Sequence, residues 1–226
     1  MPNEHAAAVP AAVPAAVPAT DPRTPTRDRL LRAAIALIAE VGADNVRTRA
    51  VAERAGVNQA LVHYHFGSLA DLVREAVDTV AAADAAPYLD ALHGGASATE
   101  AVAGLFEVLQ GVGEVTADQL VMFDLLARAT RGQPARGRVQ RMLADGRRQV
   151  AARLAEAQRR GEIGGGVDVE ALATMLLALL DGLGIHRLID PEVDVAAVGD
   201  LVLTALVTPT GVGQEPVPGG SGERSS

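Results

Sequence analysis

The 226-residue sequence contains no cysteine and no tryptophan, and only two tyrosines and three phenylalanines. Without cysteine, a disulfide scaffold is excluded, and so is any cysteine-based metal or redox site. Aromatic residues favour strands, and their scarcity beside abundant Ala, Val and Leu favours helices. The length suits one two-part protein or two small domains, and it is sufficient to bury a core.

Long apolar runs are also missing. The longest, residues 171–180, is too short to span a bilayer and is closed by Asp181. No apolar N-terminal run with a basic flank resembles a secretory signal. We therefore expect a soluble, cytoplasmic protein with no membrane partner.

Lysine is absent too, so every fixed positive charge is an arginine. The net charge of −8 at first argues against nucleic acid as a partner. The distribution matters more, because residues 23–72 carry seven Arg against five acidic residues, a local excess of positive charge. Residues 128–160 carry ten Arg against two acidic residues, and residues 162–200 carry eight acidic residues against one Arg. A nucleic-acid surface in the first of these regions is thus not excluded by the overall charge.

The two ends of the chain have the composition of disordered tails. Residues 1–25 repeat an Ala-Ala-Val-Pro unit, and this density of proline blocks helix formation. Residues 209–226 are rich in Gly, Pro and Ser. We expect order to begin near Thr26 and to end near residue 208.

The ordered part reads as one helix after another. Thr26 is a plausible N-cap of a first helix that ends at Gly42. A short second helix ends at Gly56, and Asn58 caps a third that spans residues 59–66. Ser68 then caps a longer helix from Leu69 to about Ala83. Explicit breakers place the later helices at residues 98–111, 117–131, 134–161, 168–189 and 193–207.

Two short helices joined by the sequence AGVN form a helix-turn-helix. Gly56 allows the turn, and Val57 can fill the angle between the helices. In the second of these helices Val62 and Phe66 are four residues apart and share the face toward the core. The opposite face is short and polar, and it can enter a major groove because it carries small residues near the helix N-terminus. Its members are Gln59, Ala60, His63 and Tyr64.

The stretch RLLRAAIALIAEVGADNVRTRAVAERAGVNQALVHYHFGSLADLV resembles the DNA-binding domain of the tetracycline-repressor (TetR) family. This resemblance implies an all-α protein with a helix-turn-helix DNA-binding domain at residues 26–68 and a helical effector-binding and dimerisation domain at residues 69–208. It places the recognition helix on Gln59 to His65. It departs from the family at Leu69, where a Lys usually contacts phosphate. Residues from the motif and the resemblance together form the predicted DNA-binding set: Arg47, Thr48, Asn58, Gln59, Ala60, Leu61, His63, Tyr64 and His65.

A second predicted site concerns the small-molecule effector. Large flexible or aromatic side chains in the later helices are ordinarily core residues, but the resemblance implies that some of them line a ligand pocket. Asp124, Asp181 and His186 lie within apolar helices and are either polar pocket groups or groups that cap or pair at a dimer interface. The predicted lining residues are Phe106, Met122, Phe123, Leu126, Met142 and Met175.

Two helices, at residues 168–189 and 193–207, are apolar around more than one face. One face packs on the domain core, and we expect the other to pack on the same helices of a second subunit. Together with the resemblance to the TetR family, this interface predicts a homodimeric repressor. Two recognition helices bind a pseudo-palindromic operator in double-stranded DNA, and a small-molecule effector releases it.

Alternative interpretations remain open at this point. His63 and His65 point to different helix faces and do not suit a shared metal ion, so no metal and no cofactor are expected. The arginine-rich segment 128–160 is either a solvated face that pairs with the acids of residues 162–200, a second nucleic-acid surface, or a place where Arg128, Arg131 or Arg138 meets an anionic effector. A helical ligand carrier or interaction module with a vestigial helix-turn-helix is the alternative function. An enzyme is not expected, since no nucleophile–base pair, catalytic carboxylate pair or phosphate loop is evident.

Overall fold

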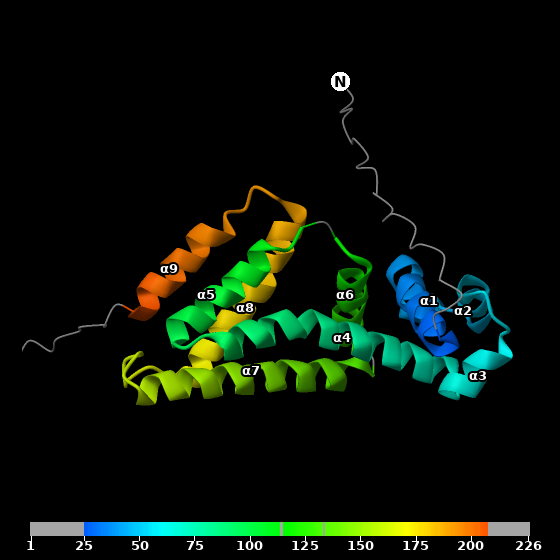
Figure 1. The fold of residues 1–226 in the computed structure, drawn as a ribbon, viewed down its shortest axis with the longest axis horizontal. Coiled ribbons are helices and arrows are strands. Elements are labelled where there is room, and N and C mark those ends of the chain that lie inside the picture. Colours follow the sequence, from blue (N-terminus) through cyan, green and yellow to red (C-terminus); the bar gives the residue numbers. More distant parts are fainter. Residues whose placement is uncertain (1–24, 114, 133, 208–226) are drawn as a thin grey trace, which may run out of the picture.

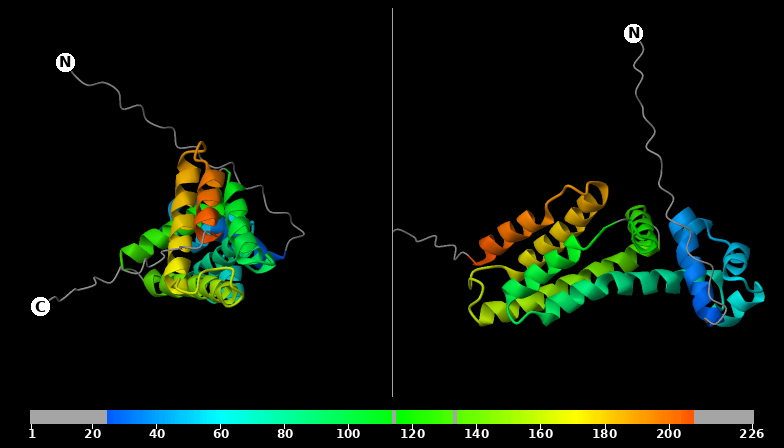
Figure 2. Two further views of the ribbon diagram at one scale, coloured as in Figure 1. Left: turned by 90° about the vertical axis from the view of Figure 1, so that its left-hand side faces the viewer. Right: turned by 45° about the horizontal axis from the view of Figure 1, so that its top comes forward.

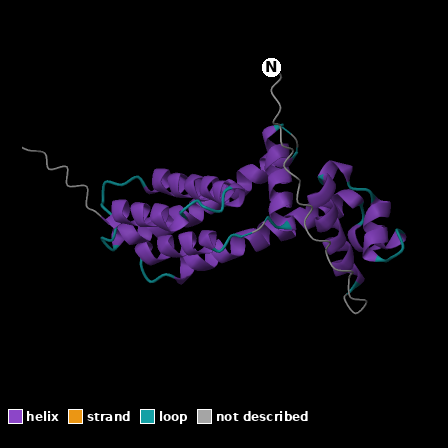
Figure 3. Cartoon of the chain, turned by 90° about the horizontal axis from the view of Figure 1, so that it is seen from above, coloured by secondary structure: helices purple, strands orange, loops and turns teal. Residues whose placement is uncertain are grey.

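The structure is a computed structural model that describes residues 25–113, 115–132 and 134–207. Within these ranges every regular element is a helix (Figure 3), which confirms the predicted all-α class. The tails predicted to be disordered lie outside the described residues, apart from Pro25. The elements are α1 (Thr26–Val41), the 3₁₀ helix η1 (Ala43–Asn45), α2 (Thr48–Ala55), α3 (Ala60–Phe66), α4 (Leu69–Gly94), α5 (Ala98–Gln110), α6 (Ala117–Thr130), α7 (Ala135–Arg159), α8 (Val169–Ile189) and α9 (Val195–Val207).

Helices α1–α3 gather at one end of the molecule and form what we call the three-helix unit (Figure 1). Helix α4 begins beside α3 and runs the length of the molecule, with α7 alongside it (Figures 1 and 2). Helices α5, α8 and α9 lie on the same side of this pair, at the end distant from the three-helix unit. Helix α6 stands between them and α1. We call α4–α9 the helical domain.

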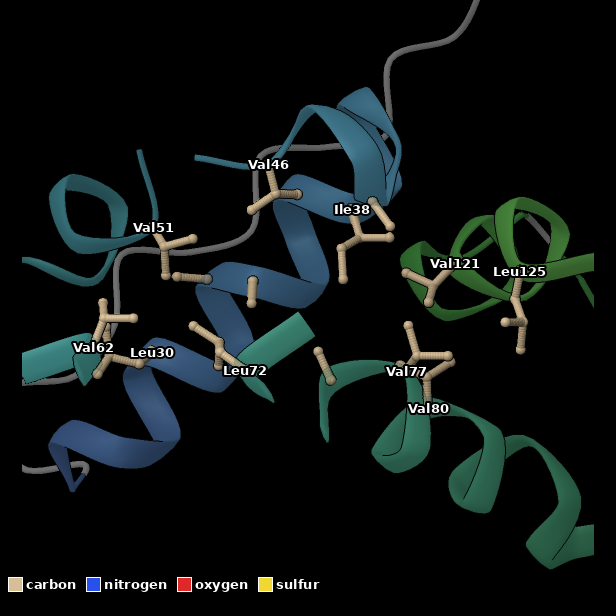
Figure 4. Packing of buried hydrophobic residues seen from close by; sticks show 14 of the residues in the cluster. Leu30, Ile38, Val46, Val51, Val62, Leu72, Val77, Val80, Val121 and Leu125 are labelled. Atoms are coloured by element: carbon tan, nitrogen blue, oxygen red, sulfur yellow. The ribbon is translucent and has the colours of Figure 1, made fainter. Parts of the chain in front are cut away.

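Two hydrophobic cores hold this arrangement, and they do not follow the boundary between the two parts. The first core joins Leu30 and Ile38 of α1 to Val121 of α6. In Figure 4 the side chains of Ile38 and Val121 point toward one another near Val77 of α4. Truncating one fully buried leucine of this kind costs about 2–5 kcal/mol. The three-helix unit is therefore fixed to α6 as well as to α4. The second core lies among the end of α4, α5, the end of α7, α8 and α9.

Most of the residues that begin and end the first four helices match the sequence pattern; the start of α1 and the end of α4 do not. Gly42 ends α1, and its N–H donates to the carbonyl of Ile38. Ser68 caps α4, because its Oγ accepts a hydrogen bond from the N–H of Asp71 at 3.1 Å. The prediction that Thr26 caps α1 is wrong: Thr26 lies inside the helix, and Pro25, which makes no side-chain cap, precedes it.

Helix α4 is longer than predicted. The sequence indicated an end near Ala83, whereas the helix continues to Gly94 and includes Pro87. A proline inside a helix removes one backbone hydrogen bond and costs about 3 kcal/mol. Packing offsets this cost, since Tyr88 and Leu92, one turn apart, lie in the second core. The later helices start and end within two residues of their predicted limits.

Helix α8 is the one described helix whose length and composition would allow it to cross a membrane. Its most apolar window has a mean hydropathy of 1.6. Leu172, Leu176 and Leu180 of α8 are buried in the second core, but only 28% of this window is buried. Helix α8 is longer than the apolar run of residues 171–180, because it continues past Asp181 to Ile189.

Candidate nucleic-acid interface and ligand site

The turn between α2 and α3 has the geometry that the sequence predicts. Gly56 adopts a left-handed conformation, with φ 65° and ψ 39°, which is costly for residues with a Cβ. Its N–H donates to the carbonyls of Ala52 and Glu53, and the N–H of Val57 donates to Ala52 at 3.0 Å. These bonds close the end of α2 and direct the chain into α3.

One side of α3 packs against the first core, and its other side is exposed. Asn58 Oδ1 accepts a hydrogen bond from the N–H of Ala60 at 2.8 Å, so the predicted cap is confirmed. Val62 is fully buried in the first core. Phe66 is half-buried and packs against the same core, and the guanidinium carbon of Arg27 lies 4.9 Å from its ring centroid. Arg27 also pairs with Glu75 of α4 at 2.6 Å, which ties α1, α3 and α4 together.

The polar face of α3 is a connected exposed surface. Gln59, Ala60, His63 and Tyr64 are all exposed, and Tyr64 has 81% of its surface accessible. The ring of Tyr64 meets that of His65 edge-on, with centroids 5.0 Å apart. A bulky aromatic side chain with this exposure contributes nothing to the core, so it is available to a partner. We call these exposed residues, with Asn58, the reading surface.

Two of the predicted contact residues lie off this surface. Leu61 is half-buried and packs against the first core, so it is turned away from the polar face. His65 is half-buried. Leu69, in the place of the family lysine, is also half-buried against the first core. Leu69, at the start of α4, therefore contributes to the first core, at the position where a lysine would contact a DNA phosphate.

Arg47 and Thr48 lie at the start of α2. Arg47 is exposed, and its Nη1 donates to the carbonyls of Asp44 and Val46, both at 3.0 Å. Thr48 is half-buried in the first turn of the helix. The side chain of Arg47 is thereby oriented by the backbone while its remaining N–H groups stay free for an acceptor.

The predicted pocket residue Asp124 has another role in the structure. Its Oδ2 accepts a hydrogen bond from the N–H of Ala43 at 3.3 Å, across the boundary between α6 and η1. One turn later Arg128 pairs with Asp44 at 2.9 Å. A Cβ added to Gly42 would lie 3.1 Å from Asp124, so the loop approaches α6 closely. We call these contacts the α6 junction.

The six residues predicted to line a ligand pocket are not brought to one place. Phe106 is buried in the second core, where it packs against Gly199. Met122, Leu126 and Met142 are half-buried against the first core, and Phe123 is half-buried on α6. Met175 is 54% exposed on α8. His186, the remaining polar candidate, is exposed near the end of α8.

Asp84 of α4 interacts electrostatically with Asp118 of α6 and with Asp181 of α8, and Tyr88 of α4 interacts with Asp84 and Asp181. The three carboxylates are partly shielded but still exposed, and Tyr88 is half-buried. Burial and then the charge of Asp118 raise the pKa of Asp84, and burial and then the charge of Asp84 raise the pKa of Asp181. Burial, followed by the charges of Asp84 and Asp181, raises the pKa of Tyr88 to about 12. We call these four residues the acidic cluster. Of these four residues only Asp181 is predicted from the sequence as a pocket or interface group, although Asp84 also lacks an opposite charge one turn away in an apolar stretch.

The acidic cluster is electrostatically unbalanced. In the described part of the chain none of its carboxylates forms an ion pair. Nor do the described residues include any group of three or more His, Asp or Glu side chains arranged to hold a metal ion. The cluster thus offers negative charge from α4, α6 and α8 without the geometry of a metal site.

The arginines of residues 128–160 do not pair mainly with the acids of residues 162–200, as one alternative held. Only Arg160 does so, with Glu162 at 2.8 Å. Arg138 pairs with Asp78 of α4, and others pair within α7. The first part of this segment therefore faces α4 and η1 rather than the acidic region.

The three-helix unit, α1–α3, contains a helix-turn-helix with an exposed polar face, and the larger helical domain, α4–α9, follows it. This is the architecture of a helical DNA-binding regulator. The family model described as bacterial regulatory proteins, tetR family, matches residues 30–76. A second model, described as BetI-type transcriptional repressor, C-terminal, matches residues 98–208. The chain belongs to the TetR family of transcriptional regulators, whose members are DNA-binding transcription factors rather than enzymes.

Solved structures agree with this assignment. A protein from Rhodococcus sp. described as a TetR-family transcriptional regulator is 28% identical, with a TM-score of 0.64, over 81% of this chain and 98% of its own. A transcriptional regulator from Saccharomonospora viridis, solved in complex with choline, is 29% identical, with a TM-score of 0.63, over 79% of this chain and 93% of its own. GusR of Salmonella enterica shares the fold at 23% identity, with a TM-score of 0.66, over 83% of this chain and 97% of its own. A comparison with curated proteins finds no match.

Proposed function

We propose that this TetR-family regulator is a cytoplasmic homodimeric repressor that binds a pseudo-palindromic operator and is released by a small organic cation. The observation that carries the DNA-binding role is the reading surface. It is exposed on one side of α3, while Val62 on the other side is fully buried. A helix held in this way presents its side chains to a major groove without having to reorder.

The proposed contacts divide into two kinds. Gln59 has the amide that can pair with an adenine edge, and Ala60 leaves room for the bases beside it. Arg47, Thr48 and Tyr64 can donate to phosphates and fix the register of the helix on DNA, whereas the Nδ1 of His63 already donates to the carbonyl of Gly67 at 3.2 Å. Leu61 packs on the first core, and the ring of the half-buried His65 contacts those of Tyr64 and Phe66.

Exposed apolar stripes on α8 and α9 support the proposed dimer. On α8, Met175, Ile185 and Ile189 are exposed at helical spacing, and Ile189 has 79% of its surface accessible. On α9, Leu201 is 70% exposed between the exposed Ala197 and Ala205. Exposed apolar residues in contiguous patches are typical of protein interfaces. Packing the two helices on their copies in a second protomer would cover both stripes.

The acidic cluster supports an organic cation as the effector. Asp84 is repelled by both Asp118 and Asp181, and none of the three forms an ion pair with a described residue, so a bound cation would relieve the repulsion on Asp84. Tyr88 adds an aromatic ring, which attracts cations such as quaternary ammonium groups. The similar regulator from Saccharomonospora viridis binds such a cation, choline.

The α6 junction provides a route from effector to DNA. Asp118 lies in the first turn of α6, and Asp124 and Arg128 lie further along the same helix in contact with η1. A cation that draws α6 toward α4 and α8 would move the three-helix unit with it. The two recognition helices of a dimer must lie about 34–36 Å apart to occupy successive major grooves, so a change in this spacing lowers operator affinity.

The test of DNA binding is fluorescence anisotropy with the DNA that flanks the gene for this chain, at two salt concentrations, against a shuffled duplex. We expect tight, sequence-dependent binding that weakens steeply with salt. Equal and weak binding to both duplexes, repeated with sites selected from random DNA, would refute the repressor and favour a helical carrier with a vestigial helix-turn-helix.

The same assay tests the effector. Adding choline should release the duplex from the wild-type protein, and Asp84→Asn should require at least several-fold more choline. Asp90→Asn is the matched control, because Asp90 is exposed on the same helix and lies outside the acidic cluster. Release that is equal in all three proteins would exclude the acidic cluster as the cation site.

A further inference from the structure

A cleft with a volume of about 700 Å³ lies where the three-helix unit meets the helical domain. Its walls come from four places: the η1–α2 segment, the start of α4, the end of α6 and the start of α7. It contains none of the acidic cluster residues. The cleft is therefore separate from the proposed cation site.

The charge of the cleft is strongly positive. Its lining residues include five arginines against two acidic residues, Asp44 and Asp78. The arginines are Arg47, Arg74, Arg128, Arg138 and Arg141. A concave surface lined by one sign of charge focuses the field and attracts ions of the opposite sign.

Several of these arginines keep unused binding capacity. Arg128 has a buried Nε–H without an acceptor among the described residues, although its terminal nitrogens pair with Asp44. Arg141 is exposed and forms no hydrogen bond or ion pair with any described residue. Buried N–H donors in folded proteins nearly always have an acceptor, so we expect a bound group to accept the hydrogen bond of Arg128 Nε–H.

The arginines also repel one another. Burial, followed by the positive charges of Arg74 and Arg141, lowers the pKa of Arg138 from its ordinary value. Arg138 retains an ion pair with Asp78 and a hydrogen bond from Nη2 to the carbonyl of Arg74 at 3.1 Å. Arg74 and Arg141 thus add positive charge around the partly buried Arg138, and an anion in the cleft would offset it.

We propose that this cleft binds a small molecule that carries a phosphate or carboxylate group. The anionic group pairs with Arg138 and Arg141, and an apolar part packs on Val73, Val77 and Leu125 at the cleft wall. Guanidinium groups bind such oxyanions through paired hydrogen bonds. Because the ligand touches the three-helix unit and the helical domain together, it stabilises one relative position of the two.

Binding of the anion does not depend on the proposed repressor function, but its effect on operator affinity does. A ligand that favours the DNA-bound position raises operator affinity, and one that favours the released position lowers it. The phosphate backbone of DNA shares this chemistry and is the competing source of anionic groups, since Arg47 also belongs to the predicted DNA contacts. The experiment must separate the two.

The probe is inorganic pyrophosphate, titrated into the full-length protein at low salt by isothermal titration calorimetry, without DNA. We expect saturable binding with one site per protomer and a dissociation constant below about 1 mM. Arg141→Gln should weaken it about fivefold or more, the effect of losing roughly one close charge pair. Because Arg141 has no partner in the described structure, this substitution leaves the fold intact.

Arg136→Gln is the matched control. Arg136 lies on the same helix, is exposed and has no partner among the described residues, yet it does not line the cleft. It should bind pyrophosphate as the wild-type protein does. No saturable binding to the wild-type protein, or equal weakening by both substitutions, would overturn the proposed site.

A competition arm distinguishes a free anion from the DNA backbone. If the cleft binds a free anion, Arg141→Gln leaves the salt dependence of DNA binding unchanged, whatever effect the anion has on operator affinity. The contrary result is that operator DNA excludes pyrophosphate and that Arg141→Gln reduces the slope of log affinity against log salt concentration by about one. The cleft would then bind backbone phosphate, and the proposal would fail. Should the protein bind pyrophosphate but no operator, the anion site would stand and the repressor function would not.

Discussion

The carboxylate of Asp44 lies 2.9 Å from the guanidinium of Arg128, and this ion pair joins the three-helix unit to α6. Arg128 is largely buried, whereas Asp44 is exposed. Beside the pair, the carboxylate of Asp124 accepts the N–H of Ala43. Two contacts therefore hold η1, which precedes the helix-turn-helix, against α6. Helix α6 also carries Asp118 of the acidic cluster.

Asp44→Asn should weaken the α6 junction with a small loss of stability, since exposed ion pairs contribute about 0.2–1 kcal/mol. Its larger effect should be on coupling: the ratio of operator affinities without and with choline should fall toward one. Anisotropy titrations of the operator at several choline concentrations measure this ratio. Asp145→Asn serves as the control, because Asp145 is exposed and pairs only with Arg148 on the same helix. Unchanged coupling in Asp44→Asn would remove the pair from the signalling route.

Gln59→Ala should relax the base preference at one position in each half-site, because the amide that pairs with an adenine edge is lost. Discrimination at that position should fall by about 1–3 kcal/mol, while binding to the rest of the site changes little. A panel of operators substituted at single positions gives the measurement. An unaltered preference at every position would exclude Gln59 from the reading surface.

Gly56→Ala should destabilise the three-helix unit by about 1–2 kcal/mol, the cost of a left-handed conformation for a residue with a Cβ. Nothing lies within 4 Å of the added Cβ, so the cost is conformational rather than steric. Gly137→Ala, inside α7, should instead stabilise by about 0.5–1 kcal/mol. Thermal unfolding followed by circular dichroism compares the two, and opposite signs are the expected result.

Leu201→Glu should dissociate the proposed dimer, because a charge replaces an apolar side chain at the centre of the α9 stripe. Light scattering after size-exclusion chromatography should give twice the protomer mass for the wild-type protein and a single protomer mass for the variant. Leu143→Glu is the control, since Leu143 is exposed on α7 outside both stripes. A dimer that persists in Leu201→Glu would place the interface elsewhere.

Asp181→Asn should raise the melting temperature at neutral pH by about 1–3 °C, a modest effect for an exposed carboxylate. The pKa of Asp181 is raised in the folded protein, so the folded state binds this proton more tightly than the unfolded state does. Its contribution to stability is therefore lost as pH rises from 3.8 through the raised pKa. Asp181→Asn has no charge at this position and therefore does not lose this stability as pH rises. Melting curves between pH 3 and pH 7 should converge at the acidic end, and a constant difference would refute the cause given for the shift.

The sequence predicted the three-helix unit closely because short-range chemistry fixes it. Gly42 and Gly56 end helices, and Asn58 and Ser68 begin them, each through bonds to neighbouring residues. The end of α4 could not be predicted in this way. Its last turns, beyond Pro87, lie in the second core, which also contains residues of α7 and α8 that are distant in the sequence.

Among the candidate sites, too, local sequence patterns predict those on a single helix but not those formed by several helices. The reading surface follows from the period of one short helix, apart from Leu61, whose side chain packs on the first core. The acidic cluster and the arginine cleft each need three or more helices, so no local pattern reveals them. Asp124 was recognised as an unusual polar residue in an apolar helix, but its partner, the N–H of Ala43, lies 81 residues away.

The most direct test of the account is the selection of bound sequences from random double-stranded DNA by the wild-type protein. The account predicts enrichment of two inverted half-sites whose centres are about one helical turn, or 34–36 Å, apart. This result requires α3 to read bases and two protomers to bind together. Failure to enrich any sequence, or a single motif without inverted symmetry, would contradict the proposed homodimeric repressor.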